Sequence, residues 1–146
     1  MKNILAEVAV LFSYPKNLII LILRWLLAYG FAMPVVLKVN NVDDTISWFD
    51  KMSIPLPALS TYLVLGIEIA GIVLLILGLF TRFISVMLAF VMLGAIFFVH
   101  LANGFSVANN GFEVPLYYLI FLMIFASFGA GKYSFDHILS KDINYE

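Results

Sequence analysis

The side chains that could do chemistry in this chain are few, and they lie in or beside strongly apolar stretches. Arg24 and Glu68 stand deep inside two such stretches, and His100 closes a third. A charge in the middle of a membrane-spanning helix costs about 2.5–3.5 kcal/mol, so it normally faces a partner or a polar cavity. Histidine is the side chain whose charge changes nearest neutral pH, which suits proton transfer. These three residues are therefore the catalytic candidates.

A polar break from His100 to Glu113 separates two apolar stretches and collects candidate binding groups. It holds two Asn-Gly-Phe triplets, at 103–105 and 110–112, one acid, and no lysine or arginine. Asn-Gly pairs favour turns because Gly and Asn tolerate positive φ. We expect the break to fold back onto its helices as a lid over a pocket, with an ordinary polar turn as the alternative. The candidate ligand-binding residues in and near it are Lys38, Asn103, Phe105, Glu113 and Tyr117.

The two deepest charges, Arg24 and Glu68, are predicted to face each other. At about 1.5 Å rise per residue, Arg24 lies about 10 Å and Glu68 about 14 Å from the inner ends of their stretches. An arginine side chain bridges that difference. The pair would serve either catalysis or a static clamp between two helices, and the sequence leaves both open.

The composition places the chain in the lipid bilayer. Of its 146 residues, 64% are apolar and 12% charged, against about half and about a quarter in ordinary soluble domains. A net charge of −1 without a basic stripe argues against a nucleic-acid partner. The absence of cysteine excludes a disulfide relay, a cysteine-ligated iron–sulfur cluster and covalently attached haem. No flavin fingerprint or metal-binding motif occurs, and the two histidines lie in separate parts of the chain.

Four apolar runs approach the ~20 residues that a membrane-spanning helix needs. They predict an all-α fold, an integral membrane four-helix bundle that forms a single transmembrane domain over residues 1–146. The expected spans are at about 18–37, 58–77, 83–100 and 114–128. Between the first two, Asp43-Asp44-Thr45 precedes apolar residues at helical spacing, which predicts a short amphipathic helix in the first outer loop.

The two ends of the chain show weaker sequence patterns than the apolar stretches. Residues 1–14 are predicted to form a short helix on the membrane surface, with a loosely ordered tail as the alternative, and Lys132–Glu146 to form a soluble tail. Four spans place both termini on the same side of the membrane. That side holds five basic residues, against two on the opposite side. The five are Lys2, Lys16, Arg82, Lys132 and Lys141, and the two are Lys38 and Lys51. The excess predicts cytoplasmic termini in a prokaryotic inner membrane, with the polar break outside.

Several motifs resemble the DoxX family. The run Gly66-Ile-Glu68 with Gly71, followed by Leu75–Arg82, is similar to the second span and turn of that family. Met92–His100 and the residues after it are similar to the third span and its exit. The resemblance covers about residues 18–136 and implies a four-helix membrane protein often labelled an oxidoreductase. Its polar positions match Arg24, Lys38, Glu68, His100 and Asn103, with Glu113 as a weaker addition.

The resemblance and the residues leave two functions open. In the first, the chain is a membrane redox subunit that binds a quinone or a similar isoprenoid ligand from the bilayer. His100 or Asn103 would bind a carbonyl oxygen, and Glu68 or Glu113 would pass protons. A protein partner would then bring the electrons, and a homo-oligomer is also compatible. In the second, the chain is a non-enzymatic scaffold, chaperone or transport bundle whose outer loop docks a partner.

Overall fold

The computed structural model describes Glu7, Val10 and residues 15–143, with side chains up to Ser140. The predicted surface helix at residues 1–14 therefore lies, apart from two residues, outside the described part. Within that part every regular element is helical, which confirms the all-α prediction. The long helices are α2 (Lys16–Asn40), α4 (Pro57–Leu77), α5 (Thr81–Gly94) and α6 (Glu113–Phe128). A π-helix, Ala95–His100, and a 3₁₀ turn, Leu101–Asn103, extend α5.

Three helical segments are long and apolar enough to cross a membrane. They are Lys16–Asn40, Pro57–Leu77 and Thr81–Asn103, and each contains its predicted span and extends slightly beyond it. The fourth, α6, is as apolar but has 16 residues, fewer than the ~20 of a full span. The chain is therefore an integral membrane protein, and the count of four spans stays a prediction.

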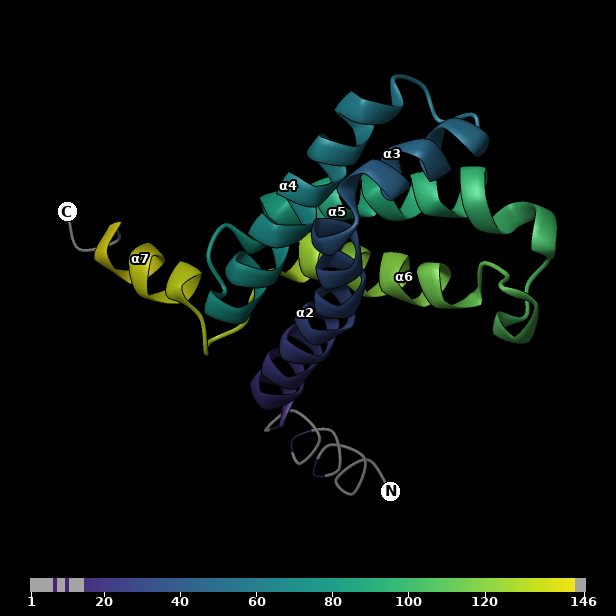
Figure 1. Cartoon of the computed structure of the whole chain (residues 1–146). Helices are drawn as coiled ribbons and strands as arrows, with labels where there is room; N and C mark the ends of the chain where they lie inside the picture. The colour runs from purple at the N-terminus through teal and green to yellow at the C-terminus, as the bar shows by residue number, and fades with distance from the viewer. Residues whose placement is uncertain (1–6, 8–9, 11–14, 144–146) are drawn as a thin grey trace.

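The helices pack in chain order, with α2 against α4, α4 against α5 and α5 against α6. In Figure 1, α5 and α6 lie side by side, and α2 runs obliquely across the other helices. The predicted amphipathic helix is present as α3 (Val42–Lys51), which packs on α4. It begins with Asp43 and Asp44, where carboxylates favour a helix N-terminus, and buries Phe49.

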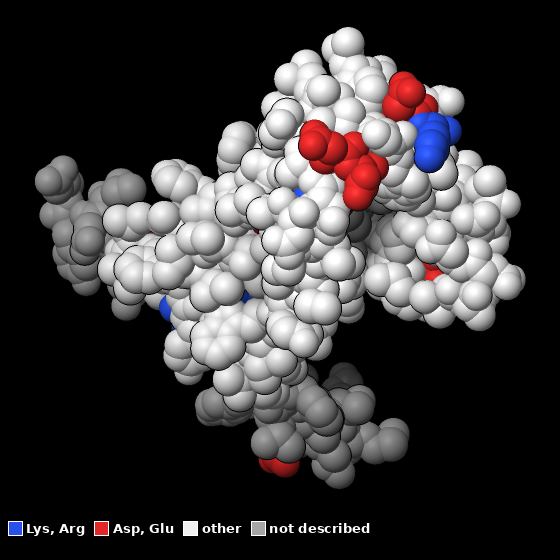
Figure 2. All heavy atoms as spheres, viewed as in Figure 1, with Lys and Arg blue, Asp and Glu red and all other residues white. Residues whose placement is uncertain are grey.

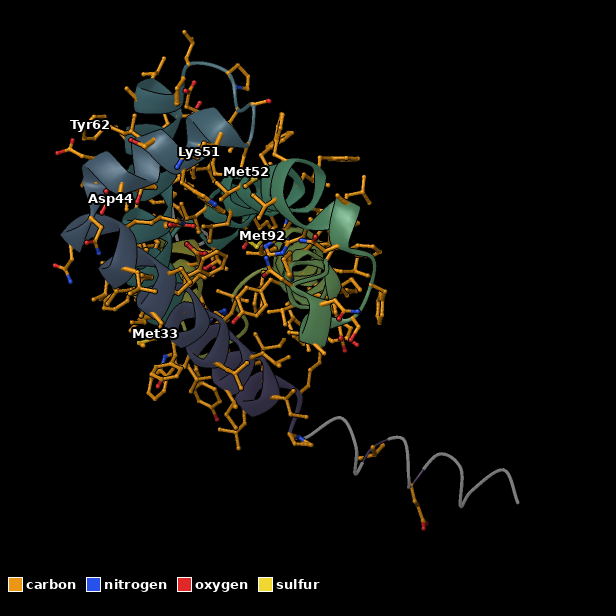
Figure 3. All side chains as sticks on the ribbon, turned by 45° about the vertical axis from the view of Figure 1, so that its right-hand side comes forward. Met33, Asp44, Lys51, Met52, Tyr62 and Met92 are labelled. Atoms are coloured by element: carbon orange, nitrogen blue, oxygen red, sulfur yellow. The ribbon has the colours of Figure 1, made fainter. Side chains whose placement is uncertain are left out.

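Apolar side chains occupy both the inside and most of the outside of this bundle. Met92 on α5 lies in the interior, whereas Met33 on α2 and Tyr62 on α4 point away from it and are 61% and 60% exposed (Figure 3). On the face shown in Figure 2, charged side chains gather over α3, and most of the remaining surface is uncharged. Apolar side chains exposed over whole helices fit a lipid environment. The buried core consists of Leu27, Ala28, Phe31, Leu75, Ile84, Leu88, Met92, Leu122 and Phe125.

The segment after α6, which we predicted to be a soluble tail, contains a further helix. This helix is α7 (Phe135–Ile143), and Asp136 near its start is bound to the turn between α4 and α5. The Asp136 carboxylate accepts from the backbone N–H groups of Phe80, at 2.7 Å, and Thr81, at 2.9 Å. An N-terminal helix turn has backbone N–H groups without partners inside the helix. Asp136 supplies those partners from 55 residues away, a contact that the local sequence does not reveal.

Candidate functional site

A cavity of about 730 Å³ lies between α2, α3, α4, the extended α5 and the start of α6. Its volume falls in the ~300–1,000 Å³ range of small-molecule sites. Met92, labelled in Figure 3, lies on its wall. Three ionisable residues predicted to be functional, Lys38, Glu68 and His100, line the same space. The aromatic part of its wall is formed by Phe31, Trp48, Phe49, Phe90, Phe98 and Tyr118.

An ion pair between Lys38 and Glu68 joins α2 to α4 at this cavity. Lys38 Nζ donates to Glu68 Oε1 and Oε2, each at 2.7 Å. Glu68 is 2% exposed and Lys38 is 20% exposed, so the carboxylate is enclosed while the ammonium keeps an opening to the cavity. The position of Lys38 in the last turn of α2 is favourable because the C-terminal end of a helix is partially negative.

The predicted pairing of Arg24 with Glu68 is wrong. Arg24 is wholly buried at the other end of α2, and its Nη2 donates to the Tyr133 carbonyl oxygen at 2.7 Å. Arg24 and Lys38 are separated by about 21 Å along the helix, at ~1.5 Å per residue. The depth estimate failed because Arg24 lies level with the end of α4, where a Cβ atom on Gly78 would overlap its Nη1. Because α2 crosses α4 obliquely (Figure 1), the ends of the two helices are not at the same depth. Arg24 lies apart from the cavity.

His100 ends the π-helix and lines the cavity. Its Nδ1 lies 2.8 Å from the Asn110 carbonyl oxygen. A carbonyl oxygen can only accept, so Nδ1 carries the proton and Nε2 of the neutral ring is an acceptor. π-Helical turns occur frequently at functional sites, because they change the direction of the side chains that follow. The ring is thereby held in one orientation with one nitrogen left for a ligand.

The loop between His100 and Glu113 folds back on itself through backbone hydrogen bonds. Gly111 N–H donates to the Ser106 carbonyl at 2.9 Å, and Phe112 N–H donates to the Gly104 carbonyl at 3.0 Å. A Cβ atom on Gly111 would overlap the Gly104 and Phe105 carbonyl groups, so this close approach requires glycine. Residues of this loop that line the cavity are Val107, Asn110 and Gly111.

The remaining predicted binding residues hold this loop and are not among the residues that line the cavity. Asn103 Nδ2 donates to the Asn110 carbonyl at 3.2 Å, and Phe105 packs edge-to-face on Phe112 at 5.5 Å. Glu113 Oε2 accepts from Val107 N–H at 3.0 Å, and Glu113 Oε1 accepts from the Tyr117 hydroxyl at 3.1 Å. Their direct role in the structure is therefore to position the loop beside His100.

Tyr118 is a cavity residue that our sequence reasoning missed. It is the neighbour of the predicted Tyr117, and one step along a helix turns a side chain by about 100°. Its ring packs on Phe31, and its hydroxyl lies so close to Gly30 that a Cβ atom there would overlap it. The absence of a side chain at Gly30 was the available signal, since glycine within a membrane helix often marks close packing.

Comparisons of the sequence with known proteins point to one family. The family model described as DoxX matches residues 19–101, the range that contains Arg24, Lys38, Glu68 and His100. A Haemophilus influenzae protein named "Uncharacterized protein" is 33% identical over 130 residues, which is 84% of this chain and 83% of that protein. The Bacillus subtilis protein named "Putative oxidoreductase CatD" is 34% identical over 96 residues, 66% of this chain and 69% of that protein. No solved structure matches the chain significantly.

Proposed function

The chain belongs to the DoxX family, and we propose that it is a membrane redox subunit that binds a quinone or a similar isoprenoid ring and works with a partner protein. The observation that carries the proposal is the convergence of Lys38, Glu68 and His100 on one apolar, aromatic-walled cavity. An aromatic wall with a few polar groups suits a flat, largely apolar ring that carries oxygen atoms. The name of the Bacillus subtilis relative, an oxidoreductase, supports the same class of activity.

Lys38 is the group that would hold a ligand oxygen. An ammonium has three N–H donors, and Lys38 uses two on the oxygens of Glu68. Its third donor remains for a carbonyl oxygen, because no further acceptor of Lys38 occurs among the described residues. A charge-assisted hydrogen bond of this kind is about twice as strong as one between neutral groups.

Glu68 and His100 are the groups that would exchange protons. Reduction of a quinone to a quinol adds two electrons and two protons at its oxygens. His100 would take up or release a proton at Nε2, and Glu68 at either carboxylate oxygen as the Lys38 contact is lengthened or restored. The chain has no cysteine, so it has no thiol with which to accept the electrons. We propose that a partner protein supplies them, and that the outer loop is where it docks.

The same proposal includes the topology. With four spans, the ends of α2 and α6 that meet near Lys16 and Lys132 lie in the cytoplasm of a prokaryote, and the cavity lies toward the outer face. The distribution of basic residues supports this arrangement. The cavity would then receive its ligand from the bilayer and face the partner outside.

Two glycines in α-helices, at positions where the backbone has room for a Cβ atom, allow a test that adds volume to the cavity. Gly94 lines the cavity, whereas Gly66 does not, and a Cβ atom at either position would meet nothing within 4 Å. Gly94→Leu and Gly66→Leu therefore introduce the same side chain, one inside the cavity and one outside it. Quinone is extracted from each protein after purification in mild detergent and is measured by liquid chromatography with mass spectrometry.

We expect wild type and Gly66→Leu to retain quinone, and Gly94→Leu to lose at least about tenfold in affinity, which corresponds to ~1.4 kcal/mol. Glu68→Gln should retain quinone but lose electron transfer, because the amide cannot carry the proton. If wild type and Gly94→Leu carry the same amount, or wild type carries none, the cavity is not a quinone site. A protein partner recovered with quinone-free protein would favour the scaffold function.

A further inference from the structure

We propose that the opposite end of the bundle holds a second site, which binds a phosphate group such as the headgroup of an anionic phospholipid. A pocket of about 620 Å³ lies there, between the start of α2, the turn between α4 and α5, the end of α6 and the segment that leads into α7. It is separate from the quinone cavity in every lining residue. The inference does not depend on the proposed redox function.

The pocket has an excess of positive charge. Lys16, Arg82 and Lys132 come from three distant parts of the chain and line it together, with His137 beside them. All three cations are exposed. Among the side chains that the structure describes, the one ion pair is that of Lys38 with Glu68, so none of the three has a carboxylate partner there.

The single acid in the lining is already occupied. Asp136 uses one oxygen on the backbone N–H of Phe80 and the other on that of Thr81. It also attracts Arg24 behind it. Both oxygens of the Asp136 carboxylate therefore already accept hydrogen bonds from the start of α5. Lys16, Arg82 and Lys132 therefore remain for a ligand of the opposite charge.

The backbone holds these cations near one another. Lys132 N–H donates to Asn17 Oδ1 at 3.1 Å, which ties the segment after α6 to the start of α2. Gly129 has a φ of +78°, and a Cβ atom on it would lie 3.3 Å from Arg82 Nε, so the arginine passes closely over this turn. A guanidinium suits phosphate because its parallel N–H groups can bind two oxygens at once.

The rim of the pocket indicates that the ligand has an apolar part. Phe83 and Phe128 line it and are each 67% exposed. These aromatic side chains stand at the ends of α5 and α6, where a membrane helix reaches the headgroup region. A free anion would gain nothing from them, whereas a phospholipid would place acyl chains along them. Basic pockets between membrane helices are a known arrangement for phospholipid headgroups.

The test uses full-length protein in mild detergent and compares three ligands at equal ionic strength. These are phosphatidylglycerol, phosphatidylcholine with the same acyl chains, and inorganic phosphate. Binding is measured by native mass spectrometry and by the shift in thermal unfolding. The variants are Lys16→Gln, Arg82→Gln, Lys132→Gln and the triple variant. Lys51→Gln, an exposed lysine on α3 at the other end, is the control.

We expect wild type to bind phosphatidylglycerol at least about tenfold more tightly than phosphatidylcholine. Each single substitution should weaken binding about fivefold, the equivalent of ~1 kcal/mol per basic residue at an anionic membrane surface. The triple variant should lose the preference, and Lys51→Gln should keep it. If inorganic phosphate binds and displaces the lipid, the site is supported and its ligand is a soluble phosphate. Folded single and triple variants with the wild-type preference would overturn the proposal.

Discussion

The two ends of the bundle, named outer (Lys38 and Glu68) and inner (Arg24) after the proposed topology, both bury a charged side chain but surround it differently. At the outer end, Glu68 is neutralised by a side chain, Lys38, which opens onto a cavity. At the inner end, Arg24 is fully buried and donates one hydrogen bond to a backbone carbonyl. Its Nε and Nη1 have no hydrogen-bond partner among the described residues. Glu68 is thus paired beside a cavity, whereas the Arg24 side chain is enclosed by the protein.

This difference suggests that the two buried charged residues have different roles. An arginine keeps its proton under all ordinary conditions, so Arg24 contributes a fixed charge that ties α2 to the segment before α7. Carboxylate and imidazole groups change protonation more readily, and they lie together at the cavity. Under the proposed function, proton transfer belongs to Glu68 and His100, and we propose a structural role for Arg24.

The largest expected effect is at the inner end, for Gly78→Ala. Gly78 has a φ of +68°, and a Cβ atom on it would overlap Arg24 Nη1 and approach Ser134 Cβ to 2.6 Å. The backbone conformation costs a non-glycine residue about 1–2 kcal/mol, and overpacking costs about 1–3 kcal/mol more. The free energy of unfolding should thus fall by about 2–5 kcal/mol, measured by equilibrium unfolding in mixed micelles.

Gly66→Ala is the control for that prediction. Gly66 lies within α4 with no atom near its hypothetical Cβ, and Gly→Ala in a helix gains up to about 1 kcal/mol. This variant should be neutral or more stable. If Gly78→Ala unfolds with the wild-type free energy, Gly78 does not pack against Arg24 and Ser134 as closely as described above.

A smaller effect is expected for the outer ion pair. Glu68→Leu leaves Lys38 without its acceptor and should cost about 2–3 kcal/mol, below the ~3–5 of a sealed pair because Lys38 is 20% exposed. Lys38→Met combined with Glu68→Leu should cost less than Glu68→Leu alone. The free energies of unfolding of the four proteins in this cycle measure the coupling.

The control for this cycle is the pair of Arg24 and Glu68, which the sequence analysis predicted to interact. Arg24→Met and Glu68→Leu should have additive costs, because the two residues bind different partners. Coupling between Arg24 and Glu68, or its absence between Lys38 and Glu68, would contradict the separation of the two ends.

The smallest effect is expected for Tyr117→Phe in the outer loop. The hydroxyl donates to Glu113 in an exposed position, so its loss should cost about 0.5 kcal/mol. Backbone hydrogen bonds continue to hold the loop, and quinone retention should stay unchanged. Thermal unfolding against Tyr29→Phe, a change at an exposed tyrosine on α2, measures the difference. A loss above about 2 kcal/mol would mean that this hydroxyl organises the outer end.

Local patterns were sufficient for the long helices and for α3, but not for the π-helix or α7. Apolar runs of nearly 20 residues predicted the membrane helices, and the acidic start with apolar spacing predicted α3. The Asn-Gly-Phe repeat predicted turns, and the loop does fold back through Gly111. These features depend on neighbours in the chain, so the sequence alone contains the information for them.

Only the tertiary structure decided which charges meet. Glu68 pairs with Lys38 and not with Arg24, and Arg24 binds a carbonyl 109 residues away. Helix periodicity fixes the order of side chains along each helix, but not the tilt and rotation of one helix against the next. Tyr118 faces the cavity in place of Tyr117, and Asp136 binds the start of α5, for that same reason. The mutual orientation of the helices depends on packing across the whole bundle.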